Sequence, residues 1–296
     1  MKPAPFAYRA PRSLPEGLDE LARHGGECKV LAGGQSLIPV MTFRLAQPAL
    51  LVDVNGLREL DFVTATGDGG LRLGALVRQR RLEREREVAR RAPLLAEALP
   101  HVAHPQIRNR GTLGGSLAHA DPAAELPAVA VALAARLRLE RAGGSRWVPA
   151  GEFFHGLFAT ALAEDELLVE IELPPLPPRT GCAFLEVARR HGDYAQVGVA
   201  AVLTLDESGR CAAARLVFLS VGDAPMTADG AAALLLGEAP AGEAIAAAAD
   251  HAARREIDPV DDIHASADFK RHLARVLADR VLRRAAARAA GGEDGG

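Results

Sequence analysis

The stretch IRNRGTLGGSLAHADPAAELP, residues 107–127, contains two adjacent glycines flanked by hydroxyl side chains. Much earlier in the chain, residues 32–37 read AGGQSL and again combine a glycine pair with a serine. Adjacent glycines let backbone N–H groups approach an anion closely, and hydroxyl groups add further donors. A single glycine pair is more often only a tight turn, but two such loops allow each phosphate of one dinucleotide to receive donors from a different loop.

Neither glycine loop matches the common nucleotide-binding motifs. The patterns G-x-G-x-x-G and G-x-x-x-x-G-K-[ST] are both absent from these loops, which disfavours a Rossmann dinucleotide site and a P-loop NTPase. The sequence therefore predicts a phosphate site of another kind.

Length and composition indicate an ordinary globular protein. A chain of 296 residues favours two packed units, and 49% apolar with 25% charged residues argues against a disordered or membrane protein. There is no signal-peptide pattern and no apolar run long enough for a membrane span, so we expect a cytoplasmic protein. The densest basic run, residues 78–91, is interleaved with glutamates and predicts a solvated helix face, not a nucleic-acid surface.

The sequence offers no metal site of its own. The cysteines Cys28, Cys182 and Cys211 lie far apart without a C-x-x-C pair, which disfavours a disulfide framework, a zinc site or an iron-sulfur cluster. His101 and His104 lie near the second glycine loop, but no carboxylate completes a familiar ligand spacing. Any metal chemistry is therefore expected in a partner.

The first half of the chain has α/β character. Ser13 is placed to cap a short helix that stops at Gly25, and two buried strands are expected at residues 29–32 and 50–54. A second stretch begins near residues 71–73 and includes a helix from Pro93 through Val102, ended by His104 and Pro105. After the second glycine loop, an apolar helix is expected from Asp121 through Leu133, with Asp121 as its cap.

A proline-rich connector at residues 174–178 follows strands expected at 135–140 and 167–173, and marks a domain boundary. Beyond it, residues 182–188, 196–205 and 213–221 predict a three-stranded antiparallel sheet. The remainder is helical. The last helix is expected from about Ser266, and a flexible tail is expected at residues 288–296. The stripe of this helix is formed by Phe269, Leu273, Val276 and Leu277.

Three motifs in this order resemble the FAD-binding medium subunits of molybdenum hydroxylases, a family that includes aerobic carbon monoxide dehydrogenase and the flavin domain of xanthine dehydrogenase. They are residues 32–37, residues 107–127, and RRHGDYAQVGVAA at residues 189–201. The resemblance covers almost the whole chain. It implies an α+β protein with a two-subdomain FAD-binding fold of the vanillyl-alcohol-oxidase-like type, residues 1–57 and 58–175. A C-terminal domain of the kind found in these medium subunits would follow at residues 179–287.

The resemblance also implies a site. The pyrophosphate would lie between the two glycine loops, Asp121 would bind ribityl hydroxyls, and Tyr194 would lie near the isoalloxazine ring. From the residues alone, Asp121 is better explained as a helix cap and Tyr194 as a half-buried residue at a strand start. Gln35 stands where several members carry histidine, which indicates noncovalent FAD. The candidate cofactor-binding residues are Ala32, Gly33, Gly34, Gln35, Ser36, Leu37, Thr112, Gly114, Gly115, Ser116, His119, Asp121 and Tyr194.

By the same resemblance the chain is an oxidoreductase subunit that relays electrons through FAD and needs no catalytic side chain. Electrons would come from a molybdenum cofactor in a large molybdopterin-binding subunit, through [2Fe-2S] clusters of a small iron-sulfur subunit, and leave to an external acceptor. A dimer of heterotrimers is expected. One alternative is a freestanding FAD-dependent oxidase or dehydrogenase, which would need a base to activate its substrate, and no sequence motif points to such a base. The other is an assembly scaffold without flavin, which the two intact glycine loops disfavour.

Overall fold

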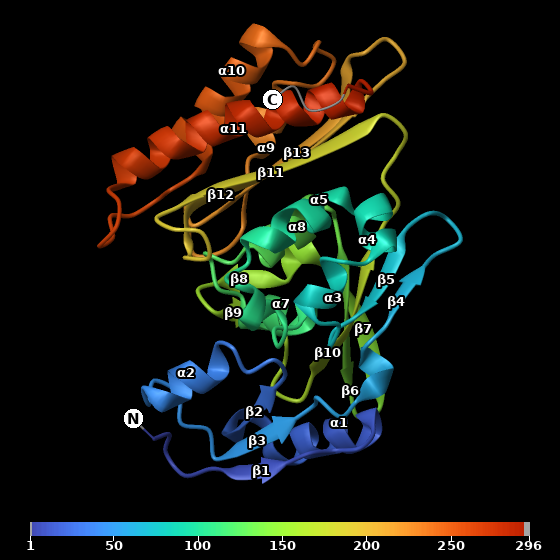
Figure 1. Ribbon diagram of the computed structural model, residues 1–296, viewed down its shortest axis with the longest axis vertical. Helices are drawn as coiled ribbons and strands as arrows, with labels where there is room; N and C mark the ends of the chain where they lie inside the picture. Colours follow the sequence, from blue (N-terminus) through green and yellow to red (C-terminus); the bar gives the residue numbers. More distant parts are fainter. Residues whose placement is uncertain (1, 293–296) are drawn as a thin grey trace.

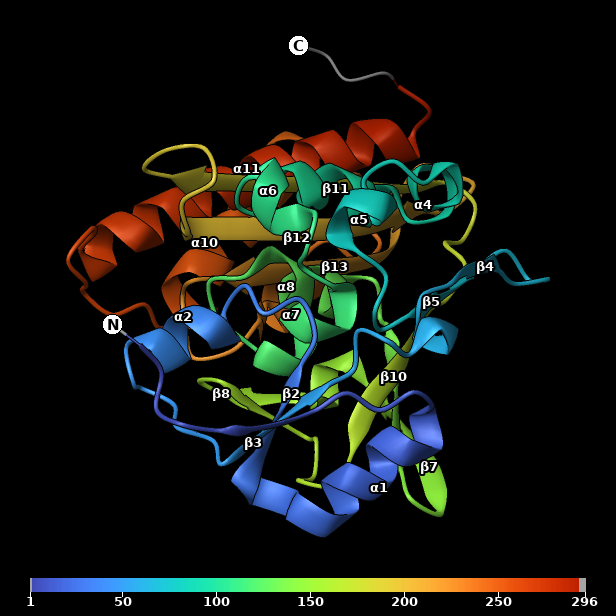
Figure 2. The ribbon, with the colours of Figure 1, turned by 60° about the horizontal axis from the view of Figure 1, so that its bottom comes forward.

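The computed structural model describes residues 2–292, which form three larger sheets and a small two-stranded hairpin (Figure 1). The N-terminal sheet lies at the bottom of this view, and the C-terminal sheet lies at the top beneath the longest helix. The helices α7 (Leu113–His119) and α8 (Glu125–Ala132) lie between these two sheets in both views (Figures 1 and 2). The second glycine pair and Asp121 therefore lie in the middle of the molecule.

The N-terminal sheet is parallel, with the strand order β1-β3-β2. The expected helix after Ser13 is confirmed, because the Ser13 hydroxyl accepts the N–H of Glu16 and the helix ends at Gly25. Its buried Leu18 and Leu21 join the apolar core beneath the sheet. The elements of this part are β1 (Ala7–Arg9), α1 (Leu14–His24), β2 (Cys28–Leu31), α2 (Leu37–Thr42) and β3 (Leu50–Asp53).

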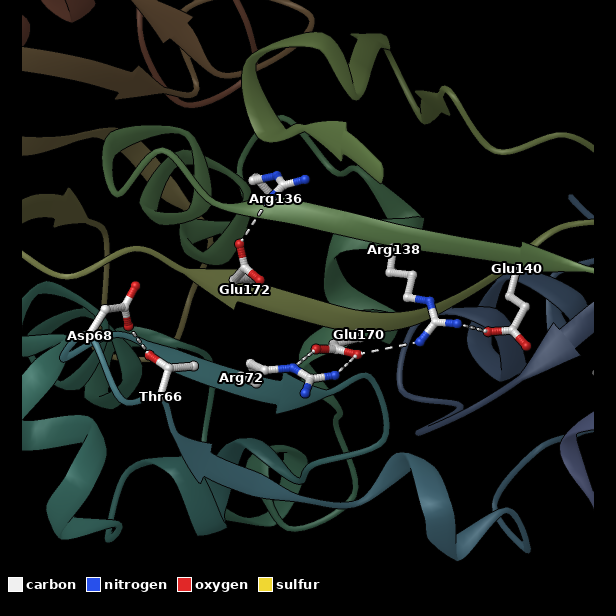
Figure 3. Close-up of polar contacts among 8 residues, drawn as sticks. All are labelled: Thr66, Asp68, Arg72, Arg136, Arg138, Glu140, Glu170 and Glu172. Carbon is white, nitrogen blue, oxygen red and sulfur yellow. Dashed lines mark hydrogen bonds and ion pairs between the residues drawn. The ribbon is translucent and has the colours of Figure 1, made fainter. Parts of the chain in front are cut away.

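The five-stranded sheet is antiparallel, in the order β4-β5-β10-β6-β7. Because side chains alternate along a strand, one face buries leucines against the helices while the other carries arginines and glutamates. On the charged face the carboxylate of Glu170 is buried between Arg72 and Arg138, and Glu172 pairs with Arg136 (Figure 3). The strands are β4 (Val63–Ala65), β5 (Leu71–Gly74), β6 (Arg136–Arg141), β7 (Gly144–Pro149) and β10 (Leu167–Leu173), and the hairpin pairs β8 (Phe154–Gly156) with β9 (Ala159–Thr160).

Several helix bounds differ from the sequence expectations. The helix from Pro93 stops early and continues only as a 3-10 turn at residues 99–101, and Pro105 begins a helix where it was expected to end one, since proline is tolerated in a first turn. The basic run at residues 78–91 is divided between two short helices. The helices are α3 (Gln79–Leu82), α4 (Arg86–Arg91), α5 (Pro93–Ala98) and α6 (Pro105–Arg108), before α7 and α8.

The C-terminal sheet has four strands where three were expected, in the order β11-β12-β13-β14. The additional strand is only two residues long, which is too short to produce a periodic pattern. Both faces are buried: alternate residues of β12 pack toward α11 and toward α8, and the neighbouring strand β11 contacts α5. The elements are β11 (Thr180–Ala188), β12 (Ala195–Leu205), β13 (Cys211–Leu219), β14 (Met226–Thr227), α9 (Asp229–Ala233), α10 (Gly242–His251) and α11 (Ala267–Ala289).

The last helix agrees with its expected stripe in part and differs at its end. Leu277 is buried and Leu273 packs against the same core, whereas Phe269 is 46% exposed. Ala274 and Val281 complete the buried face. The tail expected from residue 288 is wrong at its start, because α11 continues through Ala289. Residues 293–296 of that expected tail lie outside the described residues. Within residues 2–292, no helix combines the length and apolarity needed to cross a membrane.

Candidate functional site

The first glycine segment, residues 32–37, connects the end of β2 to the start of α2. Gly34 has a φ of 73°, a left-handed conformation that glycine adopts without strain, and the Gln35 side-chain amide donates to the Gly33 carbonyl at 2.9 Å. The backbone N–H groups of residues 33–37 donate to no acceptor among residues 2–292. Five consecutive free N–H groups at the start of a helix form a concave site suited to an anion.

The second glycine segment, residues 112–116, is not a loop but the first turn of α7. Thr112 caps this helix, and its hydroxyl accepts the N–H of Gly115 at 3.0 Å. The N–H of Gly114 donates to Ala75 at 2.8 Å, so this helix is anchored to the chain after β5. Unlike the first segment, this one retains few free donors: the Thr112 N–H and the hydroxyls of Thr112 and Ser116. The two segments therefore present different donors, mainly backbone N–H groups in the first and mainly hydroxyl groups in the second.

The fold brings the two glycine segments into direct contact. A Cβ atom added to Gly33 would lie 2.6 Å from the carbonyl oxygen of Arg110 and 2.8 Å from the Cα of Gly111. A Cβ on Gly115 would lie 3.5 Å from the Cβ of Ala32. The absence of a side chain at Gly33 thus permits the two backbones to touch, which makes one site of two distant parts of the sequence.

Two residues that the sequence motifs do not include link the glycine segments. The Asn55 side chain donates to the carbonyl of Ala32 at 2.8 Å and accepts a 2.6 Å hydrogen bond from Arg78. Arg78 also donates to the carbonyl of Arg110, next to the second segment. Asn55 and Arg78 therefore form a chain of hydrogen bonds from the carbonyl of Ala32 in the first segment to the carbonyl of Arg110 just before the second. The only sequence signal was the position of Asn55 just after a buried strand.

A half-buried carboxylate, that of Asp53, supports this bridge. Asp53 accepts a 2.6 Å hydrogen bond from the Tyr8 hydroxyl through one oxygen and one of the same length from Asn55 through the other. Burial alone raises the pKa of Asp53, but the hydrogen bonds from Tyr8 and Asn55 outweigh it and lower the pKa below its ordinary value. Asp53 is thus held ionised, and it orients Asn55 toward the glycine segments.

Two guanidinium groups make the site positive. Desolvation lowers the pKa of Arg78, and the nearby charge of Arg110 lowers it further. Arg110 is exposed, and its side chain has no hydrogen-bond or ion-pair partner within the described part of the chain. Two positive charges beside free N–H groups favour a bound anion, which would neutralise the charges and accept the N–H hydrogen bonds.

Arg108 has a structural part in this region. Its guanidinium is buried, donates to the carbonyls of Val102 and Ala103, and pairs with Glu83. Because it ties together the turn before α6, it orients the chain that leads into the second glycine segment.

Asp121 is not the cap of α8, which begins four residues later after Ala124. Its carboxylate accepts the N–H of Ala123 at 2.9 Å through Oδ1, while Oδ2 has no partner within residues 2–292. His119 lies with its ring 5.0 Å from that of Phe158, and desolvation lowers its pKa against the opposing charge of Asp121. A neutral histidine and a carboxylate oxygen thus remain available to a ligand at the end of α7.

Tyr194 lies in the loop between β11 and β12 and is 69% exposed, more than expected for a half-buried tyrosine. Partial desolvation of its hydroxyl raises its pKa, and the carboxyl groups of Asp121 and Glu125 add to the rise. Ser220 connects the start of β12 to the turn that contains Asp121. Its N–H donates to the carbonyl of Pro122 at 2.9 Å, and its hydroxyl donates to the carbonyl of Ala195 at 2.7 Å. The C-terminal domain therefore brings Tyr194 near Asp121.

Comparisons with known proteins show relatives that match almost the whole chain. Residues 4–176 match the family model described as the FAD binding domain in molybdopterin dehydrogenase, and residues 182–285 match the CO dehydrogenase flavoprotein C-terminal domain. The 6-hydroxypseudooxynicotine dehydrogenase complex subunit alpha of Paenarthrobacter nicotinovorans is 42% identical, covering 98% of this chain and 97% of its own. The carbon monoxide dehydrogenase medium chain of Hydrogenophaga pseudoflava is 39% identical, covering 98% of this chain and all of its own.

Solved structures resemble the whole chain as well. A chain of the carbon monoxide dehydrogenase from Hydrogenophaga pseudoflava that lacks the Mo-pyranopterin moiety superposes with a TM-score of 0.94 at 40% identity, covering 97% of this chain and 99% of that chain. A chain of quinoline 2-oxidoreductase from Pseudomonas putida 86 gives a TM-score of 0.92 at 40% identity, covering 98% and 99%. The match extends across both parts of the fold.

Proposed function

Because the chain belongs to the family of FAD-binding medium subunits of molybdenum hydroxylases, which are oxidoreductase complexes, we propose that its two glycine segments hold the pyrophosphate of FAD. The observation that carries this proposal is the run of free N–H groups at residues 33–37. A pyrophosphate has several anionic oxygens and needs many donors, which this segment offers without moving the backbone.

The donors beside this run fit the same group. The hydroxyls of Ser36 and Ser116 make no hydrogen bond within the described residues, and Thr112 retains its hydroxyl proton. Arg78 and Arg110 add positive charge from the side where the two segments meet. In this arrangement the first segment supplies backbone donors, and the second supplies mainly hydroxyl groups.

The far end of the site suits the flavin portion of FAD. We assign ribityl hydroxyls to the free oxygen of Asp121 and polar contact near the cofactor to His119. Tyr194 is exposed on the same side and offers an aromatic face to the ring. Gln35 makes its hydrogen bond within the loop, which is compatible with noncovalent FAD.

In the assembled complex, bound FAD supplies the ability to accept electrons singly and release them in pairs. The residues of this chain would bind and orient it. We propose a small iron-sulfur subunit as the electron source, a large molybdopterin-binding subunit as the site of substrate chemistry, and a dimer of heterotrimers as the assembly. The two-subdomain division at residues 1–57 and 58–175, the C-terminal domain at 179–287 and the cytoplasmic location stay predictions.

The experiment is a purification of the chain with and without its partner subunits, followed by absorbance spectroscopy. We expect noncovalently bound FAD that bleaches only when substrate and both partners are present. Full bleaching by a simple substrate with this chain alone would instead identify a freestanding oxidase or dehydrogenase. A chain that neither retains FAD nor binds added FAD would contradict the proposal and indicate an assembly scaffold.

A further inference from the structure

The hairpin β8–β9 presents two apolar side chains beside α7. Leu157 and Phe158 connect its two strands and are 60% and 53% exposed. The base of the hairpin is fixed, because Phe153 is buried and its carbonyl accepts the N–H of Ala161 at 2.8 Å. The tip of the hairpin is therefore an exposed apolar surface on a rigid support.

The backbone of Phe158 is strained. Its φ of 54° lies in the left-handed region, and within residues 2–292 it is the one aromatic residue with a positive φ. This conformation is unfavourable for any residue with a Cβ, and short hairpin connections usually place glycine or asparagine there. Such strain is typical of residues that contact ligands. The hairpin alone would be more stable with glycine, which indicates that the phenyl ring has a role outside the fold.

The ring of Phe158 lies at the flavin end of the proposed site. Its centroid is 5.0 Å from that of the His119 ring, and the two planes are inclined by 33°. The hairpin lies beside α7 in both views (Figures 1 and 2). Thr112 caps the start of α7 and His119 ends it, and a helix of seven residues spans roughly 10 Å. With the pyrophosphate at the start of α7 and the ribityl chain at Asp121, the flavin ring belongs at this far end.

The surface around Phe158 suits a flat apolar ring. Desolvation lowers the pKa of His119, so its imidazole is neutral at neutral pH, and Leu157 adds an aliphatic side chain. Aromatic rings attract one another through offset stacking or edge contacts, without a charged group. The side chains of Leu157 and Phe158 carry no donor for a phosphate, whereas they are complementary to a flavin ring.

We propose that Phe158 contacts the flavin ring of FAD, with Leu157 beside it, so that the hairpin β8–β9 is a third element of the cofactor site. The inference rests on the proposed function. It assigns the flavin ring to the hairpin and the pyrophosphate to the glycine segments. Phe158 binds and orients the ring and transfers neither electrons nor protons.

The test compares Phe158→Gly with the wild-type chain, by titration with FAD and by thermal unfolding without FAD. Glycine removes the ring and relieves the strain. We therefore expect FAD affinity to fall by about tenfold, while the unfolding midpoint stays equal or rises by about 2 °C. Phe158→Tyr keeps an aromatic ring and should stay within about threefold of wild-type affinity. A lower midpoint with unchanged FAD affinity would assign the ring to the fold and overturn the inference.

Arg179→Gly is the matched control. Arg179 also has a positive φ, 57°, and lies just before β11, at the opposite end of that strand from the loop that carries Tyr194. This variant should show the same small change in midpoint and wild-type affinity for FAD. An equal loss of FAD affinity in Arg179→Gly would show that relief of strain, and not loss of the ring, weakens binding, and would overturn the inference.

Titration with ADP locates the contact, because ADP has the pyrophosphate and the adenosine but no flavin ring. Phe158→Gly should leave ADP affinity unchanged, whereas Gly33→Ala should weaken both ligands. Equal losses for ADP and FAD in Phe158→Gly would overturn the inference. A wild-type chain that binds no FAD would contradict the proposed function itself. Unchanged FAD affinity in Phe158→Gly, with partner subunits lost on purification, would instead assign the hairpin tip to a subunit contact.

Discussion

The two glycine segments have nearly the same composition, yet the structure uses them differently. In the first, residues 32–37, the glycines form a turn whose five N–H groups remain free. In the second, residues 112–116, Gly114 and Gly115 lie inside a helical turn, and their N–H groups bind Ala75 and the Thr112 hydroxyl. A glycine pair thus provides backbone donors in one place and close packing in the other.

The difference has a steric cause. A Cβ at Gly114 would lie 2.5 Å from the Cβ of Ala75, so this glycine exists to let α7 approach the chain after β5. Gly33 permits a comparable approach to Arg110, while its own N–H stays free. The first segment therefore offers free N–H donors to the proposed ligand and contacts the second segment, whereas the second segment is anchored to the chain after β5 and offers mainly hydroxyl groups.

The largest effect is expected for Gly33→Ala. The new Cβ overlaps the carbonyl of Arg110 and forces the two segments apart, which removes both the free N–H run and the hydroxyls from their common ligand. We expect FAD affinity to fall by about 100-fold or more, and the free energy of unfolding to fall by about 1–3 kcal/mol. Isothermal titration with FAD and urea unfolding measure the two. Wild-type affinity for FAD in Gly33→Ala would contradict the proposal that the first segment binds FAD.

Gly114→Ala should act mainly on stability. Its Cβ meets Ala75 while the first segment stays free, so we expect a loss of about 1–3 kcal/mol in the free energy of unfolding and a smaller loss of FAD affinity. Gly151→Ala is the control, because no atom lies within 4 Å of the added Cβ; its unfolding free energy should change by less than about 0.5 kcal/mol. Equal effects of Gly114→Ala and Gly151→Ala would contradict the packing role.

Arg78→Gln should weaken FAD binding by about tenfold, because it removes a charge and the link from Asn55 to the Arg110 carbonyl. Arg78→Lys should fall between wild type and Arg78→Gln, since it keeps the charge and loses the two-pronged hydrogen bonding. Titrations at low and high salt separate the two contributions. If lysine restores full affinity, the bridging role is wrong and only the charge matters.

The smallest effects are expected for Ser36→Ala and Ser116→Ala. Neither hydroxyl makes a hydrogen bond in the described part of the chain, so stability should stay within about 0.5 kcal/mol of wild type. FAD affinity should fall by about 3–10-fold in each, the usual worth of one hydrogen bond. Thermal unfolding without FAD and titration with FAD check these values. A variant with a lower free energy of unfolding but unchanged FAD affinity would show that the hydroxyl stabilises the fold and does not bind FAD.

Local sequence patterns predicted the parts of the fold that depend on near neighbours. The helix after Ser13 and the strands β2 and β3 follow from capping and apolar runs. The use of the second glycine pair was not predictable, because it depends on Ala75 and Val77, which only the tertiary fold brings near. Likewise, the first four N–H groups of any helix lack partners within that helix, and the local sequence does not show which acceptor binds them.

The bridge between the segments was missed for a related reason. Asn55 and Arg78 belong to no motif, and each acts only because the ends of β2 and β3 lie beside the chain before α7. Asp121 was assigned as the helix cap because it precedes a proline, although its carboxylate closes a turn and α8 begins later. Long-range contacts decided these roles, and one sequence carries little information about them.

Amide hydrogen exchange of the full chain, with and without FAD, tests the central claim most directly. Without FAD, the amides of residues 33–37 should exchange rapidly, and those of 113–116 should be protected. On adding FAD, the amides of residues 33–37 should become protected, while those of 113–116 should change little. Bound FAD with unchanged exchange at residues 33–37 would contradict the assignment of the pyrophosphate to the first glycine segment.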